Sequence, residues 1–327
     1  MHSISHVLRR LSRRAAAPGD PGGCLDEDEV GALWGAVLDG ALPELELGAL
    51  LASLSIAGES PAELLGLHRA LATRQARFPR TDARRPIAIA LSGLVSGEAA
   101  FCVLLALFLR RFDVPVLLHG PLDAPEVPSA PALLRELGVL PSASLAEAER
   151  DLRTRGVVFL PVQLLSPVLG DLLALRARLG STNAAHLAAQ ALDPGAMGAV
   201  RLAMCVPGTA SGRLAGFLPA TGARSLLLAW PAGTPACDFA FRPRISLHSD
   251  GLDEIVFDAE NAEGASHAGF PAPGRLVPWM RDVIARSAPA PSPLVNLAAA
   301  CVYAAGAAGD FPQAKAIVAL QSGRLAA

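Results

Sequence analysis

Residues 86–120 constrain the fold of this 327-residue chain more than any other stretch. Two short apolar runs, Ile87–Leu91 and Val114–Leu118, flank a longer apolar run, Ala99–Leu109. Strand, helix and strand in this order predict a βαβ unit, whose two strands must be parallel. In open α/β sheets, ligands bind at the carboxyl ends of the parallel strands. The Gly/Ser-rich segment 92–98 is therefore expected at the ligand edge of the sheet.

The same alternation of strands and helices continues to the end of the chain. Further strands are predicted at Val157–Pro161, Val200–Val206, Leu226–Trp230, Arg244–Leu247 and Glu254–Asp258. Apolar helices separate most of them, which favours a mostly parallel sheet covered by helices on both faces. We therefore predict an α/β fold in which a small N-terminal helical bundle precedes a large sheet domain.

The residues before the sheet divide into two parts. Segment 1–23 carries several arginines and then a Pro/Gly-rich break, so it is predicted to be a basic N-terminal arm, either solvated or bound to phosphate. Segment 24–80 has helical periodicity, with Asp26 and Ser60 as N-caps, and is predicted to be a helical domain. Residues 81–327 form the predicted α/β domain, which returns one or two helices to the bundle.

Composition narrows the possible functions only slightly. The net charge is −2, so no global attraction to nucleic acid or to a membrane surface is expected. The five cysteines are scattered without metal-ligand spacing, as expected of reduced thiols in a cytoplasmic protein. The longest apolar run, Ala99–Leu109, is too short to cross a bilayer. We therefore expect no metal site and no membrane partner.

Several motifs resemble one family. The segments Leu25-Asp26-x-x-Glu29 and Pro43-Glu44-Leu45-Glu46-Leu47-Gly48 are similar to the N-terminal domain of anthranilate phosphoribosyltransferases. These enzymes have the TrpD-like fold of glycosyltransferase family 3, which is related to that of the nucleoside phosphorylases. The strand that ends in His119-Gly120 resembles the family's strand ending in Lys-His-Gly. The resemblance implies a homodimer paired through the helical domain.

The catalytic motifs of that family are altered here. The family's phosphoribosyl-pyrophosphate loop reads Gly-Thr-Gly-Gly-Asp-Gly, whereas this chain has Ser92-Gly93-Leu94-Val95-Ser96-Gly97-Glu98. Glycines in such a loop let backbone N–H groups approach a diphosphate, and leucine and valine side chains obstruct that approach. The family's metal-binding acids are missing from segment 231–235. We therefore predict no catalytic residues and no bound cofactor.

These departures resemble the YbiB group, which consists of anthranilate phosphoribosyltransferase-like proteins that lack the catalytic loop. The shared features include Phe159-Leu160-Pro161-Val162 and Asn183-x-x-His186. This resemblance implies a non-catalytic homodimer that binds DNA without sequence specificity, through contacts between arginine and phosphate. The candidate DNA-binding residues are Arg9, Arg10, Arg13, Arg14, Arg80, Arg84, Arg85, Arg176 and Arg178.

Two other functions remain open. The chain is alternatively a glycosyl or phosphoribosyl transferase with an altered substrate, and only in that case are Mg²⁺ and phosphoribosyl pyrophosphate expected. Its site would then use His119, Asn183 and His186. The third option is a paralogue retained for protein–protein contacts. The remnant of the family's ligand cleft is predicted at Ser92, Gly93, Ser96, Gly97, His119, Gly120, Asn183 and His186.

Overall fold

A computed structural model describes residues 4–17, 23, 25–78, 84–123, 127–194, 197–205, 209–231, 237–249, 251–261 and 269–322. The N-terminal helices are α1 (Ile4–Ala16), α2 (Glu27–Leu38), α3 (Glu44–Ala57) and α4 (Pro61–Ala72). Asp26 and Ser60 cap α2 and α4, and each takes part in a capping box with a glutamate three residues later. The helical bundle predicted from sequence is therefore confirmed.

One seven-stranded sheet forms the centre of the α/β part. Its strands lie in the order β3-β2-β1-β4-β5-β7-β8. Their bounds are β1 (Ile87–Ala90), β2 (Val116–Gly120), β3 (Val157–Pro161), β4 (Val200–Cys205), β5 (Ser225–Ala229), β7 (Arg244–Ser249) and β8 (Leu252–Phe257). The strands from β3 to β5 are parallel, and β7 and β8 continue the sheet in antiparallel pairs. A separate small sheet pairs β6 (Phe241–Arg242) with β9 (Glu260–Asn261).

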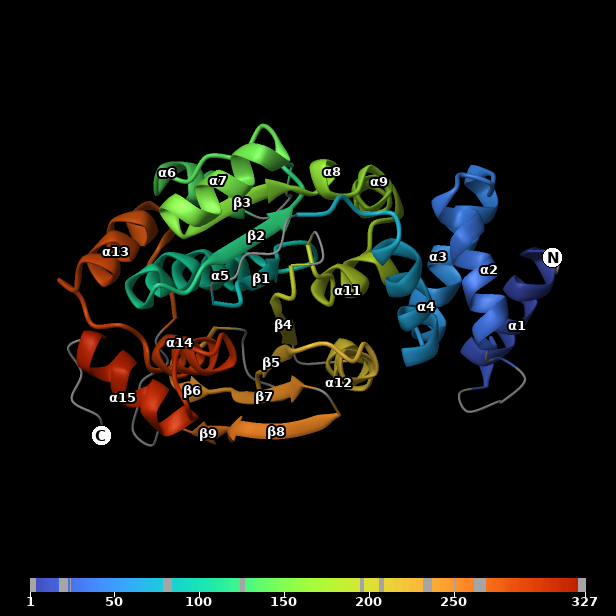
Figure 1. Cartoon of the computed structure of the whole chain (residues 1–327). Coiled ribbons are helices and arrows are strands. Elements are labelled where there is room, and N and C mark those ends of the chain that lie inside the picture. Colours follow the sequence, from blue (N-terminus) through green and yellow to red (C-terminus); the bar gives the residue numbers. More distant parts are fainter. Residues whose placement is uncertain are drawn as a thin grey trace.

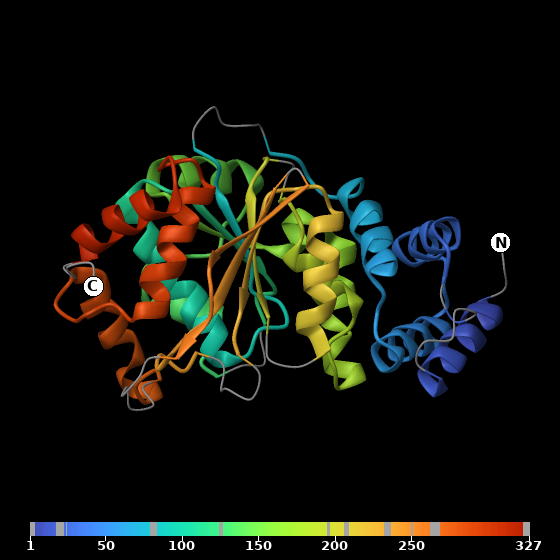
Figure 2. The same ribbon diagram turned by 90° about the horizontal axis from the view of Figure 1, so that it is seen from below.

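Helices cover both faces of the sheet, as the sequence pattern predicts (Figures 1 and 2). The helices after β1 are α5 (Ser96–Leu109), α6 (Ala130–Glu136), α7 (Leu145–Arg155), α8 (Val162–Leu165), α9 (Pro167–Ala174), α10 (Arg176–Leu179), α11 (Ala184–Gln190), α12 (Thr209–Ala220), α13 (Pro273–Ala285), α14 (Ser292–Ala304) and α15 (Phe311–Ser322). A single helix was expected over 169–179, but α9 and α10 divide that range.

The sheet separates two apolar cores. Helices α5, α13 and α14 pack on one face, together with every second residue of the central strands, such as Ile89 and Leu118. The opposite face contributes Ala90 and Leu117 to a core that also contains α9, α11, α12 and the N-terminal bundle. Helix α4 packs against α11 and α12. Figure 2 shows the bundle joined to the sheet through these helices.

The N-terminal segment is not a free arm. Helix α1 packs against α3, and Val7 and Leu11 are buried in the bundle core. Its fourth arginine, Arg14, is also buried and donates both to the Glu63 carboxylate and to the Gly58 carbonyl. The amphipathic pattern correctly predicted a helix. Its apolar face packs against the bundle, so the helix is not a solvated arm.

None of the helices described is both long enough and apolar enough to cross a membrane.

Candidate functional site

The predicted ligand edge of the sheet contains a pocket of about 610 Å³. Three groups of residues line it: the segment after β1, the segment after β2, and helices α8 to α11. They are Leu91, Ser92, Gly93, Pro121, Leu122, Asp123, Gln163, Gly170, Leu173, Ala174, Arg176, Ala177, Gly180 and His186. Most are apolar or small, with a few polar side chains among them. This volume and this lining are typical of a site for a small organic molecule.

His186 lines the pocket from helix α11. It stands at the third position of α11, where the Asn183 backbone N–H donates to its Nδ1 at 3.2 Å. Gly93 has φ +79°, and a Cβ atom there would lie 3.2 Å from the His186 Cβ. Burial, with a smaller contribution from Arg176, lowers the pKa of His186 to about 4. The imidazole is therefore neutral and packed tightly against the β1–α5 turn.

Ser92 also belongs to this turn and to the pocket wall. Its side chain is 3% exposed, and its Oγ has no hydrogen-bond partner among the described residues. A buried hydroxyl without a partner is costly unless something binds it. Because the Ser92 Oγ itself is buried beneath the wall, His186 is the polar side chain that the pocket receives next to this turn.

The other residues of the predicted cleft do not line the pocket. His119 is 1% exposed within the sheet, and burial lowers its pKa to about 4. Gly120 packs closely against Leu91, since a Cβ at Gly120 would lie 3.1 Å from that side chain. Asn183 is buried as the N-cap of α11, and its amide donates to the Leu172 carbonyl. These three are structural neighbours of the site because their side-chain positions are filled by packing and capping.

Ser96 and Gly97 begin helix α5, and Gly97 does not line the pocket. Two residues before them, Leu94 is buried in the core on the other face of the sheet. The Glu98 side chain, which is fully buried, accepts the Val95 N–H at 3.0 Å. Burial raises the pKa of Glu98 to about 7. Helix α5 thus supplies its own carboxylate to its N-terminus.

This arrangement does not fit a magnesium diphosphate. An ionised Glu98 would repel a second anion at the α5 N-terminus. Within the part of the chain that the structure describes, no three His, Cys, Asp or Glu side chains converge as metal ligands. Segment 231–235, from which the family's metal-binding acids are missing, lies mostly outside the described residues.

The candidate DNA-binding arginines of α1 lie in different environments. Arg9 and Arg13 are exposed, whereas Arg10 pairs with Glu29 at 2.5 Å. Arg14 is committed to its buried pair with Glu63 and cannot reach a phosphate.

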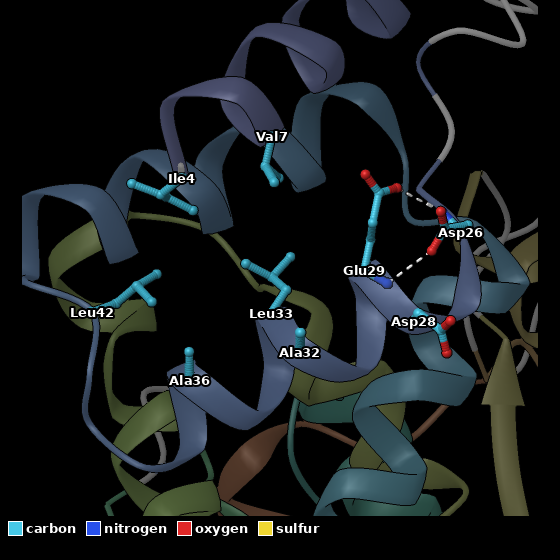
Figure 3. A pocket seen from close by; sticks show the side chains of 9 residues that line it. All are labelled: Ile4, Val7, Asp26, Asp28, Glu29, Ala32, Leu33, Ala36 and Leu42. Carbon is cyan, nitrogen blue, oxygen red and sulfur yellow. Dashed lines mark hydrogen bonds between the residues drawn. The ribbon is translucent and has the colours of Figure 1, made fainter. Parts of the chain in front are cut away.

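Figure 3 shows that α1 forms one wall of a second hollow, of about 300 Å³, whose other wall is α2.

The remaining arginines do not converge on one surface. Arg84 and Arg85 were expected beside the cleft, but they precede β1 and so lie at the opposite edge of the sheet from the pocket. Arg84 donates to the Phe112 carbonyl there, and Arg80 lies outside the described residues. Arg176 lines the pocket, whereas Arg178 pairs with Glu44 of the bundle. The two arginines of α10 therefore face different ways, as their spacing predicts.

The sequence did not predict several of the residues that line the pocket. Leu122 and Asp123 follow β2, and Gln163 belongs to the short helix α8, which was not expected. Their position after two neighbouring parallel strands was the available signal, because both strands end at the ligand edge. Gly170 and Leu173 gave no such signal, since only the packing of α9 brings them there.

Several known proteins are similar in sequence to this chain over part of its length. A family model described as the helical bundle domain of a glycosyl transferase family matches residues 18–74. The uncharacterized protein YbiB of Escherichia coli K12 is 29% identical over 290 residues, which cover 88% of this chain and 91% of that protein. An anthranilate phosphoribosyltransferase of Methylobacterium radiotolerans is 26% identical over 233 residues, covering 71% of this chain and 62% of the relative.

A solved structure agrees with the fold. The anthranilate phosphoribosyltransferase (TrpD) of Thermus thermophilus superposes with a TM-score of 0.72 at 21% identity, covering 94% of this chain and 93% of that one. The fold predicted from sequence is thereby confirmed, and the relatives provide no support for DNA binding. Residues 18–74 are thus similar to a glycosyl transferase helical bundle domain, and the chain has the fold of the anthranilate phosphoribosyltransferases.

Proposed function

We propose that this protein is a glycosyl transferase of the anthranilate phosphoribosyltransferase type with an altered substrate. The observation that carries the proposal is the pocket of about 610 Å³ at the carboxyl ends of β1, β2 and β3. A non-catalytic descendant would not need to keep a cavity of this size at the ligand edge. The names of the relatives support a transferase, although they describe those relatives alone.

The pocket residues provide the means to bind and orient a small ring. Leu91, Leu122 and Leu173 offer apolar walls, and Arg176 adds a positive charge. Among the described residues of the pocket, Asp123 has a carboxylate, which can accept a proton from the attacking group of the acceptor while that group bonds to the sugar carbon and the donor's leaving group departs from the same carbon. We infer that the altered substrate is the donor, because the Glu98 carboxylate already accepts the Val95 N–H at the start of α5, where a diphosphate would bind.

Isothermal titration calorimetry tests the proposal with three samples. Anthranilate is expected to give saturable heat, and phosphoribosyl pyrophosphate with Mg²⁺ is expected to give none. The variant Ala174→Phe fills the pocket and should abolish the anthranilate heat. Ala215→Phe, on the exposed surface of α12, is the matched control and should leave that heat unchanged.

DNA binding stays a prediction, and its test separates the two functions. A random duplex should show no gel shift at about 50 mM salt if the pocket is the functional site. A salt-sensitive shift, together with absence of anthranilate heat, would overturn the transferase proposal in favour of arginine–phosphate contacts.

A further inference from the structure

A third hollow lies at the opposite edge of the sheet from the pocket. Its volume is about 300 Å³, and its wall includes the first two residues of β3, at the amino end of that strand. Two helix ends and the segment after α6 complete the lining, which consists of Arg110, Gly138, Val139, Leu140, Asp151, Arg155, Val157 and Val158. Among the described residues, this lining and that of the pocket share no member. A ligand held here would therefore use none of the side chains that line the pocket.

Two arginines from different helices converge on this third cavity, which we call the basic hollow. Arg110 is the C-cap of α5, and Arg155 is the last residue of α7. The Arg110 Cγ lies 4.0 Å from the position that a Cβ of Gly156 would occupy, so its stem lies against the residue that follows Arg155. Both arginines line the hollow, and both are exposed. Their guanidinium groups can therefore meet an ion that arrives from solvent.

The positive charge of the basic hollow is not balanced within the described residues. Asp151 contributes a carboxylate to the lining. Its oxygens lie 3.5 Å from the Arg155 Nη1 and 3.7 Å from the Arg150 Nε, so it divides its charge between two long ion pairs. Arg110 has no carboxylate partner in the part of the chain that the structure describes. Two cations and one shared anion leave the hollow with an excess of positive charge.

The helix termini explain part of this arrangement. A cation in the last turn of a helix is favourable by itself, since it faces the negative end of the helix dipole. Arg153 also stands in the last turn of α7, but it pairs with Glu149 at 3.5 Å and does not line the hollow. The dipole therefore accounts for an arginine at each helix end but not for the convergence of Arg110 and Arg155. Arg153 provides a matched control.

The chemistry of the basic hollow favours a phosphate group. Guanidinium N–H groups match pairs of oxyanion oxygens, and a phosphate monoester offers three such oxygens with about two negative charges near neutral pH. It can therefore bond to both arginines at once. A singly charged carboxylate would gain less from the two cations, while Asp151 would still repel it.

We propose that the basic hollow binds a phosphate group between the side chains of Arg110 and Arg155. Val139 and Leu140 form an apolar part of the wall, against which the organic part of a phosphorylated small molecule can pack. The Leu140 side chain is 62% exposed, so such a contact would cover an apolar surface that now faces solvent. The site goes beyond the proposed function and does not depend on it, because the two cavities lie at opposite edges of the sheet.

Calorimetric titration of the full chain at pH 8 tests the proposal with two probes, inorganic phosphate and glycerol 3-phosphate, at constant ionic strength. Both are expected to give saturable heat. Binding of either probe supports the site, and the tighter of the two identifies the ester or the free anion as its ligand. Absence of saturable heat with both probes would overturn the proposal.

Four variants locate the bound phosphate. Arg110→Gln and Arg155→Gln should each weaken binding at least about tenfold, because each removes a charge-assisted hydrogen-bonded pair. Asp151→Asn should tighten binding about threefold, because it removes the negative charge from the lining. Arg153→Gln should leave binding unchanged. Equal effects of Arg153→Gln and Arg110→Gln, or weaker binding in Asp151→Asn, would contradict the proposed site.

A further control separates the basic hollow from the pocket. Arg176 lines the pocket, where its charge can also attract phosphate. Arg176→Gln should leave phosphate binding unchanged, and Arg110→Gln should leave the anthranilate heat unchanged. Phosphate binding that is lost in Arg176→Gln but kept in Arg110→Gln would place the anion in the pocket and overturn the inference. If anthranilate binds and neither phosphate probe does, the inference fails and the transferase proposal stands; the reverse result leaves the inference standing and the transferase proposal fails.

Discussion

Helices α5 and α11 begin with the same kind of backbone contact but have different chemical groups at their N-termini. In each, the side chain of the third helical residue accepts the N–H of the residue before the helix, Glu98 in α5 and His186 in α11. The accepting group of α5 is a buried carboxylate, and that of α11 is a neutral ring at the wall of a cavity. The two helix starts therefore differ in whether the accepting group can carry a negative charge.

This difference shows how the fold can keep a pocket at the ligand edge of the sheet although the β1–α5 turn does not suit a diphosphate. In the β1–α5 turn, the chain itself supplies the negative charge that a helix N-terminus attracts. At the start of α11, the Asn183 N–H occupies only Nδ1 of His186, so Nε2 stays available to a ligand. Four predictions test the comparison, from the largest expected effect to the smallest.

The contact between Gly93 and His186 should be the most sensitive point. Gly93→Ala forces a side chain into a left-handed backbone and against the His186 ring. We expect a loss of about 3 kcal/mol in the free energy of unfolding, measured by urea titration. Gly222→Ala is the matched control, because Gly222 has φ +67° with nothing within 4 Å of the added Cβ. Equal losses in the two variants would show that the ring contact contributes nothing.

The buried neutral histidine of β2 should limit stability in acid. Burial lowers the pKa of His119 from 6.5 to about 4, so its contribution is present above pH 6.5 and is lost as the pH falls toward 4. His119→Gln removes this titration. Its unfolding free energy relative to wild type should rise by up to about 3 kcal/mol between pH 7 and pH 4. Parallel pH profiles for the two proteins would contradict the prediction.

The carboxylate of α5 should act in the opposite direction. Burial raises the pKa of Glu98 from 4.5 to about 7, so the stability it contributes is present below pH 4.5 and is lost as the pH rises through 7. Glu98→Gln keeps an oxygen for the Val95 N–H without a charge. We expect it to stabilise the protein by about 2 kcal/mol at pH 8 and by much less at pH 5, measured by urea unfolding.

Glu147→Gln provides the control for Glu98. Glu147 also caps the start of its helix, α7, and accepts the Ala143 N–H, but its side chain is 37% exposed. Its substitution should change stability little at either pH, since water screens an exposed carboxylate. A gain at pH 8 as large as that of Glu98→Gln would show that burial is not the cause.

Ser92→Ala should have the smallest effect. Removing a buried hydroxyl without a partner among the described residues should stabilise the protein by about 0.5–1 kcal/mol, as measured by thermal unfolding. Ser142→Ala removes another buried hydroxyl without a described partner, outside the pocket lining, and should stabilise the protein similarly. A loss of stability in Ser92→Ala would show that this hydroxyl has a partner in the folded protein.

Local patterns in the sequence were sufficient for most of the fold. The expected strand Val157–Pro161 agrees residue for residue with the structure. The cap residues Asp26 and Ser60 were also predicted, because a capping box involves only neighbouring residues. Within the site, Ser92, Gly93 and His186 were predicted, since each lies next to the end of a strand or the start of a helix.

By itself, the sequence determined the order of strands and helices and the edge of the sheet where a ligand would lie. The tertiary structure alone decided which charges were already paired and which side chains reached the cavity. Arg14 meets Glu63 across 49 residues, and Gln163 joins the pocket through a short helix with no pattern of its own. Periodicity reports the face that a residue occupies, whereas a partner distant in sequence depends on how whole elements pack.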